Sequence, residues 1–316
     1  RKIMELAQQI IKGDRTALGK GITLLESTLS EHEIKAQELL KLCFPYSGKS
    51  IRVGITGVPG VGKSTFIESF GKLVTSNGKK VAVLAIDPTS QQNQGSILGD
   101  KSRMHELAAN KNAFIRPSPS SGTLGGVTNK TKDSIILCEA AGYDIILIET
   151  VGVGQSETSV SNLADFFLLL MLAGAGDELQ GIKRGIMELA DGLIINKADG
   201  NNITNAKNAS QAYKRALHLF PSMDNGWIPK VSVCSAIENT GIDKIWKMIT
   251  SHDSQMNAIG WKNKNRERQN IYWLHHRIKE ELGNKQYKLL IKEGKIITLE
   301  KEITKGKTIY QILSGL

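Results

Sequence analysis

The sequence of 316 residues contains only three cysteines and no long hydrophobic run. Cys43, Cys138 and Cys234 lie far apart, and none belongs to a Cys-x-x-Cys pair. Three widely spaced cysteines argue against a disulfide framework and a cysteine-based metal site, and they are typical of a reducing compartment. The longest apolar stretch, residues 166–173, is much shorter than the ~20 residues that a membrane helix needs. We therefore expect neither disulfides nor a membrane-spanning helix in this sequence.

Acidic residues are scarce at the C-terminal end of the chain. Residues 261–316 contain 13 Lys and Arg, six Glu and no Asp, so most of the net charge of +10 lies there. A basic tail can bind nucleic acid, a membrane surface or an acidic partner. No aromatic-interleaved RNA-binding motif accompanies the charge. We interpret the tail as a solvated helical face and expect neither nucleic acid nor a membrane as partner.

Length and composition fit one α/β domain with helical additions at both ends. Apolar residues recur at helical spacing near the N-terminus, at Ile3, Leu6 and Ile10, and Asp14 can cap a second helix. We expect a helical segment at 1–47, a nucleotide domain at 48–255 and a helical arm at 256–316. We expect strands from Ile51 and at 81–86, 114–116, 144–148, 166–172, 193–195 and 230–234, and a loop at 117–128. We expect helices at 64–76, 181–190, 242–250 and 266–282. The last of these would carry Ile271, Leu274, Ile278 and Leu282 on one apolar stripe, with His275 and His276 as surface residues rather than metal ligands.

Residues 57–64 read Gly-Val-Pro-Gly-Val-Gly-Lys-Ser and follow a strand rich in β-branched residues. They fit G-x-x-x-x-G-K-[ST], the phosphate-binding P-loop, whereas a plain glycine-rich turn would not require Lys and Ser here. Glycines let backbone N–H groups turn toward a phosphate, and the following helix adds its positive end. Lys63 would reach the β- and γ-phosphates, and the Ser64 hydroxyl would ligate Mg²⁺. The predicted nucleotide-binding residues here are Gly57, Val58, Pro59, Gly60, Val61, Gly62, Lys63, Ser64 and Thr65.

Carboxylates stand at the ends of two further strands. Asp87 follows the apolar run 81–86, and Glu149 follows 144–148, with Gly152 three residues beyond it. The carboxyl ends of parallel strands border the ligand crevice of such sheets. Nucleotide triphosphatases place a carboxylate there for the Mg²⁺ shell and a glycine N–H toward the γ-phosphate. We predict these roles for Glu149 and Gly152, while Asp100, taken alone, is better explained as a helix N-cap.

Asn196-Lys197-Ala198-Asp199 follows another strand and selects guanine by its chemistry. A carboxylate at Asp199 can accept from both N1–H and the exocyclic amine of guanine, a pair of donors that adenine lacks. Asn196 can bond the base and the loop backbone, and the Lys197 stem can cover the ring. A site with such paired polar groups rejects analogues that leave them unpaired. Ser235-Ala236 follows the last strand, where GTPases use backbone N–H groups to meet the guanine oxygen.

Together these segments resemble the methylmalonyl-CoA mutase-associated GTPases of the MeaB and ArgK type. The resemblance is carried from about Gly13 to Gly241 by long motifs: GVPGVGKST (57–65), AIDPTS (85–90), GSILGDKSRM (95–104), RPSPSSGTLGG (116–126), ETVGVGQSE (149–157), GDELQGIKRGIMELAD (176–191) and NKAD (196–199). It implies a doubly wound, mostly parallel P-loop domain with an N-terminal helical segment and a C-terminal dimerisation arm. It also implies slow GTP hydrolysis coupled to the loading, protection or rescue of an adenosylcobalamin-dependent mutase.

The resemblance also implies individual roles. Ser64, Asp87, Asp100 and Glu149 look like the Mg²⁺ and water-positioning set, which replaces the N-cap interpretation of Asp100. The loop around Gln155 looks like the second switch, and residues 177–183 look like a third switch that signals to the mutase. Lys183 is our candidate for added positive charge during catalysis. No signal peptide is visible, and the implied location is the bacterial cytoplasm or, in a eukaryote, the mitochondrial matrix.

Three other functions compete with this interpretation. A metallochaperone GTPase for nickel or for another cobalamin enzyme would use the same fold, but the nickel type predicts clustered Cys and His ligands, which this sequence lacks. A P-loop small-molecule kinase is disfavoured by Asn-Lys-x-Asp. A binding module with vestigial hydrolysis is disfavoured by Lys63, Ser64 and Glu149. Because no glutamine directly follows the Glu149 segment, we expect weak intrinsic GTP turnover. We expect the protein to be a homodimer whose turnover rises when methylmalonyl-CoA mutase binds.

Overall fold

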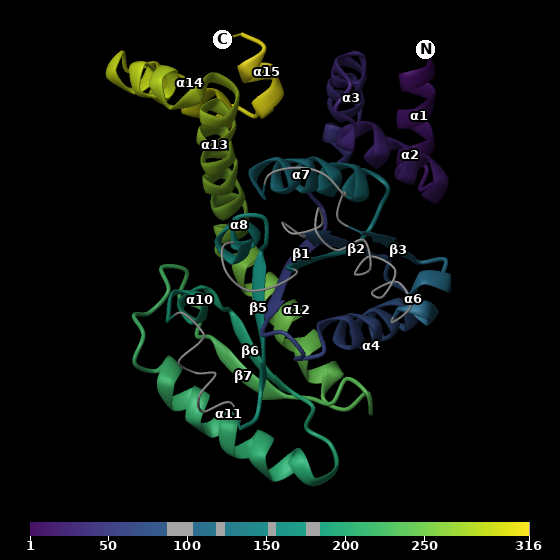
Figure 1. Ribbon diagram of the computed structural model, residues 1–316, viewed down its shortest axis with the longest axis vertical. Coiled ribbons are helices and arrows are strands. Elements are labelled where there is room, and N and C mark those ends of the chain that lie inside the picture. Colours follow the sequence, from purple (N-terminus) through teal and green to yellow (C-terminus); the bar gives the residue numbers. More distant parts are fainter. Residues whose placement is uncertain (87–103, 118–123, 151–155, 175–183, 316) are drawn as a thin grey trace. The chain divides into compact units, whose positions relative to one another are not determined.

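The computed structural model describes residues 1–86, 104–117, 124–150, 156–174 and 184–315. In these residues, seven strands form one sheet in the order β3-β2-β4-β1-β5-β6-β7, and all neighbouring pairs are parallel (Figure 1). The strands are β1 (Ile51–Gly57), β2 (Val81–Ile86), β3 (Ala113–Arg116), β4 (Ile145–Thr150), β5 (Phe166–Leu172), β6 (Gly192–Asn196) and β7 (Lys230–Val233). The predicted doubly wound α/β fold is confirmed.

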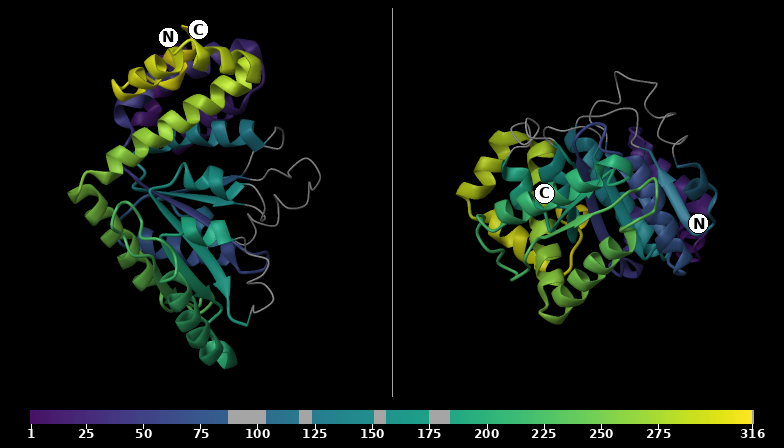
Figure 2. Two further views of the ribbon diagram at one scale, coloured as in Figure 1. Left: turned by 90° about the vertical axis from the view of Figure 1, so that its left-hand side faces the viewer. Right: turned by 90° about the horizontal axis from the view of Figure 1, so that it is seen from below.

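Strand β1 occupies the topological switch point of the sheet. From β1 the chain runs outward to β2 and β3, then returns to β4 and continues on the other side of β1 to β5, β6 and β7. The arrowheads in Figure 2 point toward one edge, so the carboxyl ends of all strands lie along it. Open α/β sheets bind ligands at this edge, beside the switch point. The P-loop leaves β1 there.

Helices cover both faces of the sheet, which explains why strands such as β5 are almost continuously apolar. On one face α4 meets α12, where the rings of Phe70 and Trp246 pack edge to face with centroids 6.0 Å apart. Helix α7 lies on the other face (Figure 1). These and the smaller helices of the domain are α4 (Lys63–Ser76), α6 (His105–Ala109), α7 (Leu124–Ala140), α8 (Ser156–Ser161), α10 (Arg184–Leu189), η2 (Gly200–Asn202), α11 (Ile203–Leu217) and α12 (Ile242–Ala258).

The N-terminal helices form a layer packed on α7. They are α1 (Lys2–Ile11), α2 (Arg15–Glu26), α3 (Ser30–Cys43) and the short η1 (Phe44–Tyr46). Gly21 permits the close approach, because a Cβ there would lie 2.8 Å from Ile10 Cδ1 and 3.1 Å from Leu137 Cδ1 of α7. The predicted cap is confirmed, since the Asp14 side chain accepts from Ala17 N at 2.8 Å.

A buried carboxylate on α7 fixes the start of β1. Glu139 accepts from Arg52 Nε at 2.8 Å and Nη2 at 3.0 Å, from Ser50 Oγ at 2.7 Å and from Gly48 N at 2.6 Å. The Glu139 side chain is fully buried, and the fork of Arg52 pairs with it through two bonds. The segment that enters the P-loop strand is therefore fixed to α7.

The chain divides into two compact units, residues 1–255 and 256–316. The second begins in the last turn of α12 and contains α13 (Trp261–Lys292), α14 (Lys295–Thr304) and α15 (Ile309–Leu313). It has a core of its own, made by the buried residues Trp273, Leu274, Ile278, Leu290, Ile296, Ile303, Ile309 and Ile312. No described helix has the length and apolar character to cross a membrane.

Two helical predictions are wrong, at Leu282 and at the start of α7. Of the stripe predicted for 266–282, Leu282 is 40% exposed, because regular helix geometry breaks at the next residue, Gly283, with φ 77°. His275 is a half-buried part of the unit, since its ring nitrogens bond Tyr287 Oη at 2.8 Å and Glu300 Oε1 at 2.7 Å. The loop predicted at 117–128 is helical from Leu124, because packing of α7 outweighs the glycines at its start.

Asp191, at the amino end of β6, is a buried acid remote from the P-loop edge. Its Oδ2 accepts from Phe167 N at 2.8 Å, and its Oδ1 lies 3.9 Å from His252 Nε2. Burial raises the pKa of Asp191 from 3.8 to about 7, against the lowering effect of the Phe167 N–H, and the nearby charge of Asp165 adds to the rise. The native state therefore holds a proton that the unfolded chain releases between about pH 4 and 7.

We predict that Asp191→Asn stabilises the protein increasingly as the pH rises. The stability of the parent falls as pH rises through this window, because the folded carboxyl must ionise while buried. An amide at position 191 stays neutral and still accepts from Phe167 N. Thermal unfolding at pH 5 and pH 8 should show the variant's advantage growing by on the order of 3 kcal/mol. The exposed-acid control Asp224→Asn should show no such change, and an equal offset at both pH values for Asp191→Asn would contradict the account.

Candidate functional site

The P-loop has the backbone that phosphate binding needs. After β1, Val61 N donates to Val58 O at 3.2 Å and closes a turn, and α4 begins at Lys63. Gly60 and Gly62 have φ angles of 78° and 90°, which residues other than glycine adopt only with strain. Lys63 folds back over the loop, where its Nζ donates to Gly57 O at 3.2 Å. The loop thus presents a lysine and a helix N-terminus together, as expected for an anion site.

Two predicted Mg²⁺ ligands lie at the start of α4 and near the end of β4. Ser64, in the first turn of α4, is 8% exposed, and Glu149 near the end of β4 is 4% exposed. Glu149 stands level with Ile55 of β1 and Ala85 of β2 in the sheet register. The neighbouring Thr150 Oγ1 donates to Thr56 Oγ1 at 2.9 Å, which joins β4 to β1 just before the P-loop.

The predicted guanine-reading residues come together at the ends of β6 and β7. Ser235 Oγ donates to Asp199 Oδ2 at 2.6 Å, which aligns the carboxylate. Ala198 N donates to Cys234 O at 3.0 Å, so the two loops are joined through the backbone as well. Lys197 has a left-handed φ of 59°, and Asn202 Nδ2 donates to its carbonyl at 2.8 Å. The loop conformation is thus fixed from both sides.

Asn196 connects this region to the P-loop. Its buried side-chain amide donates from Nδ2 to Val61 O at 2.8 Å, and its Oδ1 accepts from Ala236 N at 3.1 Å. A Cβ on Gly62 would lie 3.0 Å from Asn196 Nδ2, so a side chain there would crowd this amide as well as strain the backbone at φ 90°. The predicted bond from Asn196 to loop backbone is confirmed. One side chain therefore spans the phosphate-binding and base-binding loops.

The arrangement contains contacts that sequence reasoning missed. The Cys234 thiol lies 3.5 Å from Asn196 Oδ1, and burial raises the pKa of this thiol to about 12, so it stays a neutral S–H donor. Ser235 N and Ala236 N, predicted to meet a guanine oxygen, bond Thr240 O and Asn196 Oδ1 in this structure. Their contact with guanine stays a prediction, and a guanine oxygen would have to share the Ala236 N–H.

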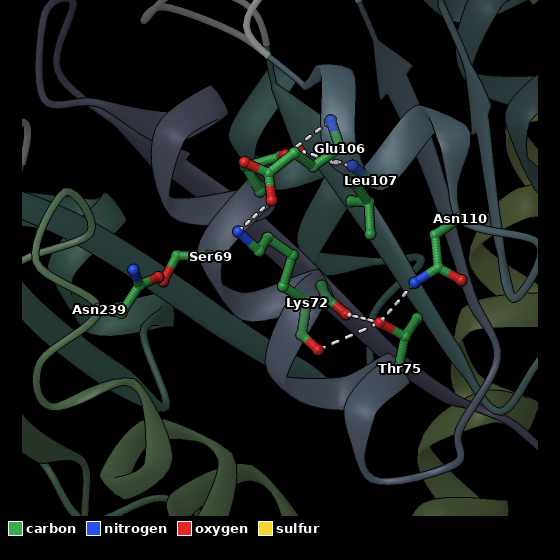
Figure 3. A network of polar contacts seen from close by, with 9 residues as sticks. Ser69, Lys72, Thr75, Glu106, Leu107, Asn110 and Asn239 are labelled. Carbon is green, nitrogen blue, oxygen red and sulfur yellow. Dashed lines mark hydrogen bonds and ion pairs between the residues drawn. The ribbon is translucent and has the colours of Figure 1, made fainter.

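Helix α4 also holds the start of α6. The Glu68 carboxylate accepts from Glu106 N at 3.0 Å and Leu107 N at 3.1 Å at the start of α6 (Figure 3). Lys72 pairs with Glu106, and Asn110 Nδ2 donates to Thr75 Oγ1 at 3.1 Å. Asp87, Asp100, Gly152, Lys183 and the loop around Gln155 lie outside the described residues. Among described residues, no group of three or more His, Cys, Asp or Glu is placed to hold a metal.

Comparison with known proteins identifies the family. The sequence model of the family described as methylmalonyl-CoA mutase-associated GTPase MeaB matches residues 18–289 of this chain. The chain belongs to this family. Its members include proteins named as GTPases, and the protein is accordingly a P-loop enzyme that hydrolyses GTP.

Individual relatives agree with the assignment to the MeaB family. The GTPase ArgK of Escherichia coli (strain K12) is 47% identical over 282 residues, which cover 89% of this chain and 85% of that protein. The mitochondrial methylmalonic aciduria type A homolog of Mus musculus is 47% identical over 290 residues, covering 89% of this chain and 70% of that protein. A solved structure described as a LAO/AO transport system kinase superposes with a TM-score of 0.77 at 37% identity, covering 96% and 97% of the two chains.

Proposed function

We propose that GTP hydrolysis by this protein assists the loading, protection or reactivation of an adenosylcobalamin-dependent methylmalonyl-CoA mutase. The observation that carries the proposal is the MeaB family match over residues 18–289, which names a mutase-associated GTPase. The similar mouse protein is named for methylmalonic aciduria. The site geometry supports the nucleotide half of the proposal, since Asn196 joins a P-loop to a guanine-specific motif.

The phosphate half would work by charge neutralisation and positioning. Lys63 and the P-loop N–H groups would hold the β- and γ-phosphates. Ser64 and Glu149 offer a hydroxyl and a carboxylate, the hard oxygen donors that Mg²⁺ prefers, and both are buried at this edge of the sheet. We propose that Asp87 and Asp100 complete this set and orient the attacking water. Bound Mg²⁺ would neutralise charge that develops on the phosphate oxygens.

The base half would recognise guanine through Asp199. Ser235 holds the carboxylate at 2.6 Å, so one oxygen is anchored and the group is oriented before the base arrives. Asn196 keeps this loop joined to the P-loop, and the Lys197 stem would cover the ring. Ala236 N would reach the guanine oxygen. Gly152 and Lys183 would act at the γ-phosphate, with Lys183 moved inward by the partner.

We propose further that the second unit mediates a homodimer. Its surface carries exposed apolar side chains, among them Leu282, Leu289, Ile291 and Ile297, which are 40% to 57% exposed. Apolar side chains of this size are suited to a protein interface. The family relationship also supports a bacterial cytoplasmic protein or a mitochondrial matrix protein, the latter through the mitochondrial relative from Mus musculus.

Asp199→Asn should change the base preference from guanine to xanthine. The amide nitrogen at position 199 can donate to the 2-oxygen of xanthine, where guanine carries a donating amine, and the amide oxygen can still accept from N1–H. GDP affinity should fall by about 100-fold or more, and XDP affinity should rise by a comparable factor. Titration with fluorescent nucleotide analogues measures both. Equal loss of GDP and XDP binding would contradict base reading by Asp199.

GTP turnover by the purified protein should be slow and should rise about tenfold or more when methylmalonyl-CoA mutase from the same source is added, as expected for an added charge at the γ-phosphate. Albumin should have no effect. Lys183→Ala should reduce the stimulated rate and leave the basal rate close to that of Lys207→Ala, a control on the exposed face of α11. Slow turnover without stimulation would overturn the mutase proposal and leave the GTPase assignment intact.

A further inference from the structure

The loop after β7, residues 235–240, is closed tightly at its base. Ser235 N donates to Thr240 O at 3.0 Å, and Thr240 N donates to Ser235 O at 3.1 Å. Gly241 follows with φ 76°, and a Cβ there would lie 2.4 Å from Val233 O, so only glycine allows this return of the chain. Inside the loop, Glu238 N donates to Ser235 Oγ at 3.1 Å, the hydroxyl that also holds Asp199.

The tip of the loop is held from the P-loop helix. Ser69 Oγ on α4 donates to Asn239 Oδ1 at 2.6 Å (Figure 3). Ser69 is 5% exposed, whereas Asn239 lies on the exposed loop with a left-handed φ of 55°. Asn tolerates this conformation better than most residues, and it supplies the acceptor. The pair joins residues that are 170 positions apart in the sequence.

We propose that Ser69 and Asn239 are positioning residues for guanine recognition. Helix α4 begins at Lys63 in the phosphate site, and Ser69 lies six residues along it, about 9 Å by helix geometry. Through Asn239 this helix fixes the loop whose Ser235 orients Asp199. The helix that binds phosphate at its N-terminus thus sets the place of the base-reading carboxylate. This inference rests on the proposed role of Asp199.

The test compares GDP with IDP, which lacks the exocyclic amine that Asp199 would accept from. Loss of one such hydrogen bond corresponds to about a fivefold change in an equilibrium constant. Ser69→Ala should therefore raise the GDP dissociation constant about fivefold and raise that of IDP less, so the preference for GDP falls. Asn239→Gly, which accepts the left-handed φ, should do the same. Asn239→Asp keeps the acceptor for Ser69 Oγ and should therefore retain the parent's preference for GDP over IDP.

Two controls separate positioning from general loosening of the fold. Ser76→Ala removes an exposed hydroxyl from the same helix, where its only described acceptor is Leu73 O, and should leave both dissociation constants unchanged. The double variant Ser69→Ala with Asn239→Gly should bind GDP about as well as either single variant, because both remove the same bond. Thermal unfolding of each variant checks that the proteins are folded at the assay temperature.

The outcomes distinguish this inference from the proposed site. An unchanged GDP-to-IDP ratio in Ser69→Ala and Asn239→Gly, with Asp199→Asn still switching to xanthine, would overturn the positioning role alone. Additive losses in the double variant would also overturn it. If Asp199→Asn does not switch the base preference, the proposed guanine site itself fails, and the positioning role fails with it.

Discussion

The side-chain amide of Asn196 is the contact on which the nucleotide site depends. It donates to Val61 O in the P-loop and accepts from Ala236 N after β7, so one planar group connects three loops. The amide is 2% exposed, and a buried amide that loses a partner costs on the order of 1–3 kcal/mol. The connection therefore resists opening. Glycine at position 62 favours this contact, since a side chain there would crowd Asn196 Nδ2 and strain the backbone.

The fold explains why such distant residues meet. With β1 at the switch point and all strands parallel, the loops after β1, β4, β6 and β7 open along one edge. Two sets of contacts fix the elements that lead to this edge, β1 and α4. Glu139 on α7 fixes the entry to β1 through Arg52, Ser50 and Gly48. On the other face, α4 carries contacts to α6 through Glu68 and to the loop after β7 through Ser69. The helix that would bind phosphate at its N-terminus therefore contacts both α6 and the loop after β7 directly.

Much of this could be predicted from sequence, because the strands are apolar runs ending in motifs whose chemistry is local. The P-loop after β1, Glu149 near the end of β4 and the motif that begins at Asn196, the last residue of β6, follow this rule. Contacts between distant side chains could not be predicted. Neither Ser69 with Asn239 nor the Cys234 thiol beside Asn196 leaves a periodic signal, and a glycine-rich start concealed the first turn of α7. The half-buried setting of His275 likewise depends on Glu300, 25 residues away.

The central claim is that phosphate and base loops form one guanine nucleotide site. Hydrogen exchange of backbone amides, followed by mass spectrometry of peptides, tests it most directly when the free protein is compared with protein saturated by GDP–Mg²⁺ and by ADP–Mg²⁺. The account predicts that GDP slows exchange in peptides covering both 57–66 and 235–240, and that ADP leaves 235–240 unprotected. Protection confined to 57–66, or the same protection of 235–240 by both nucleotides, would contradict it.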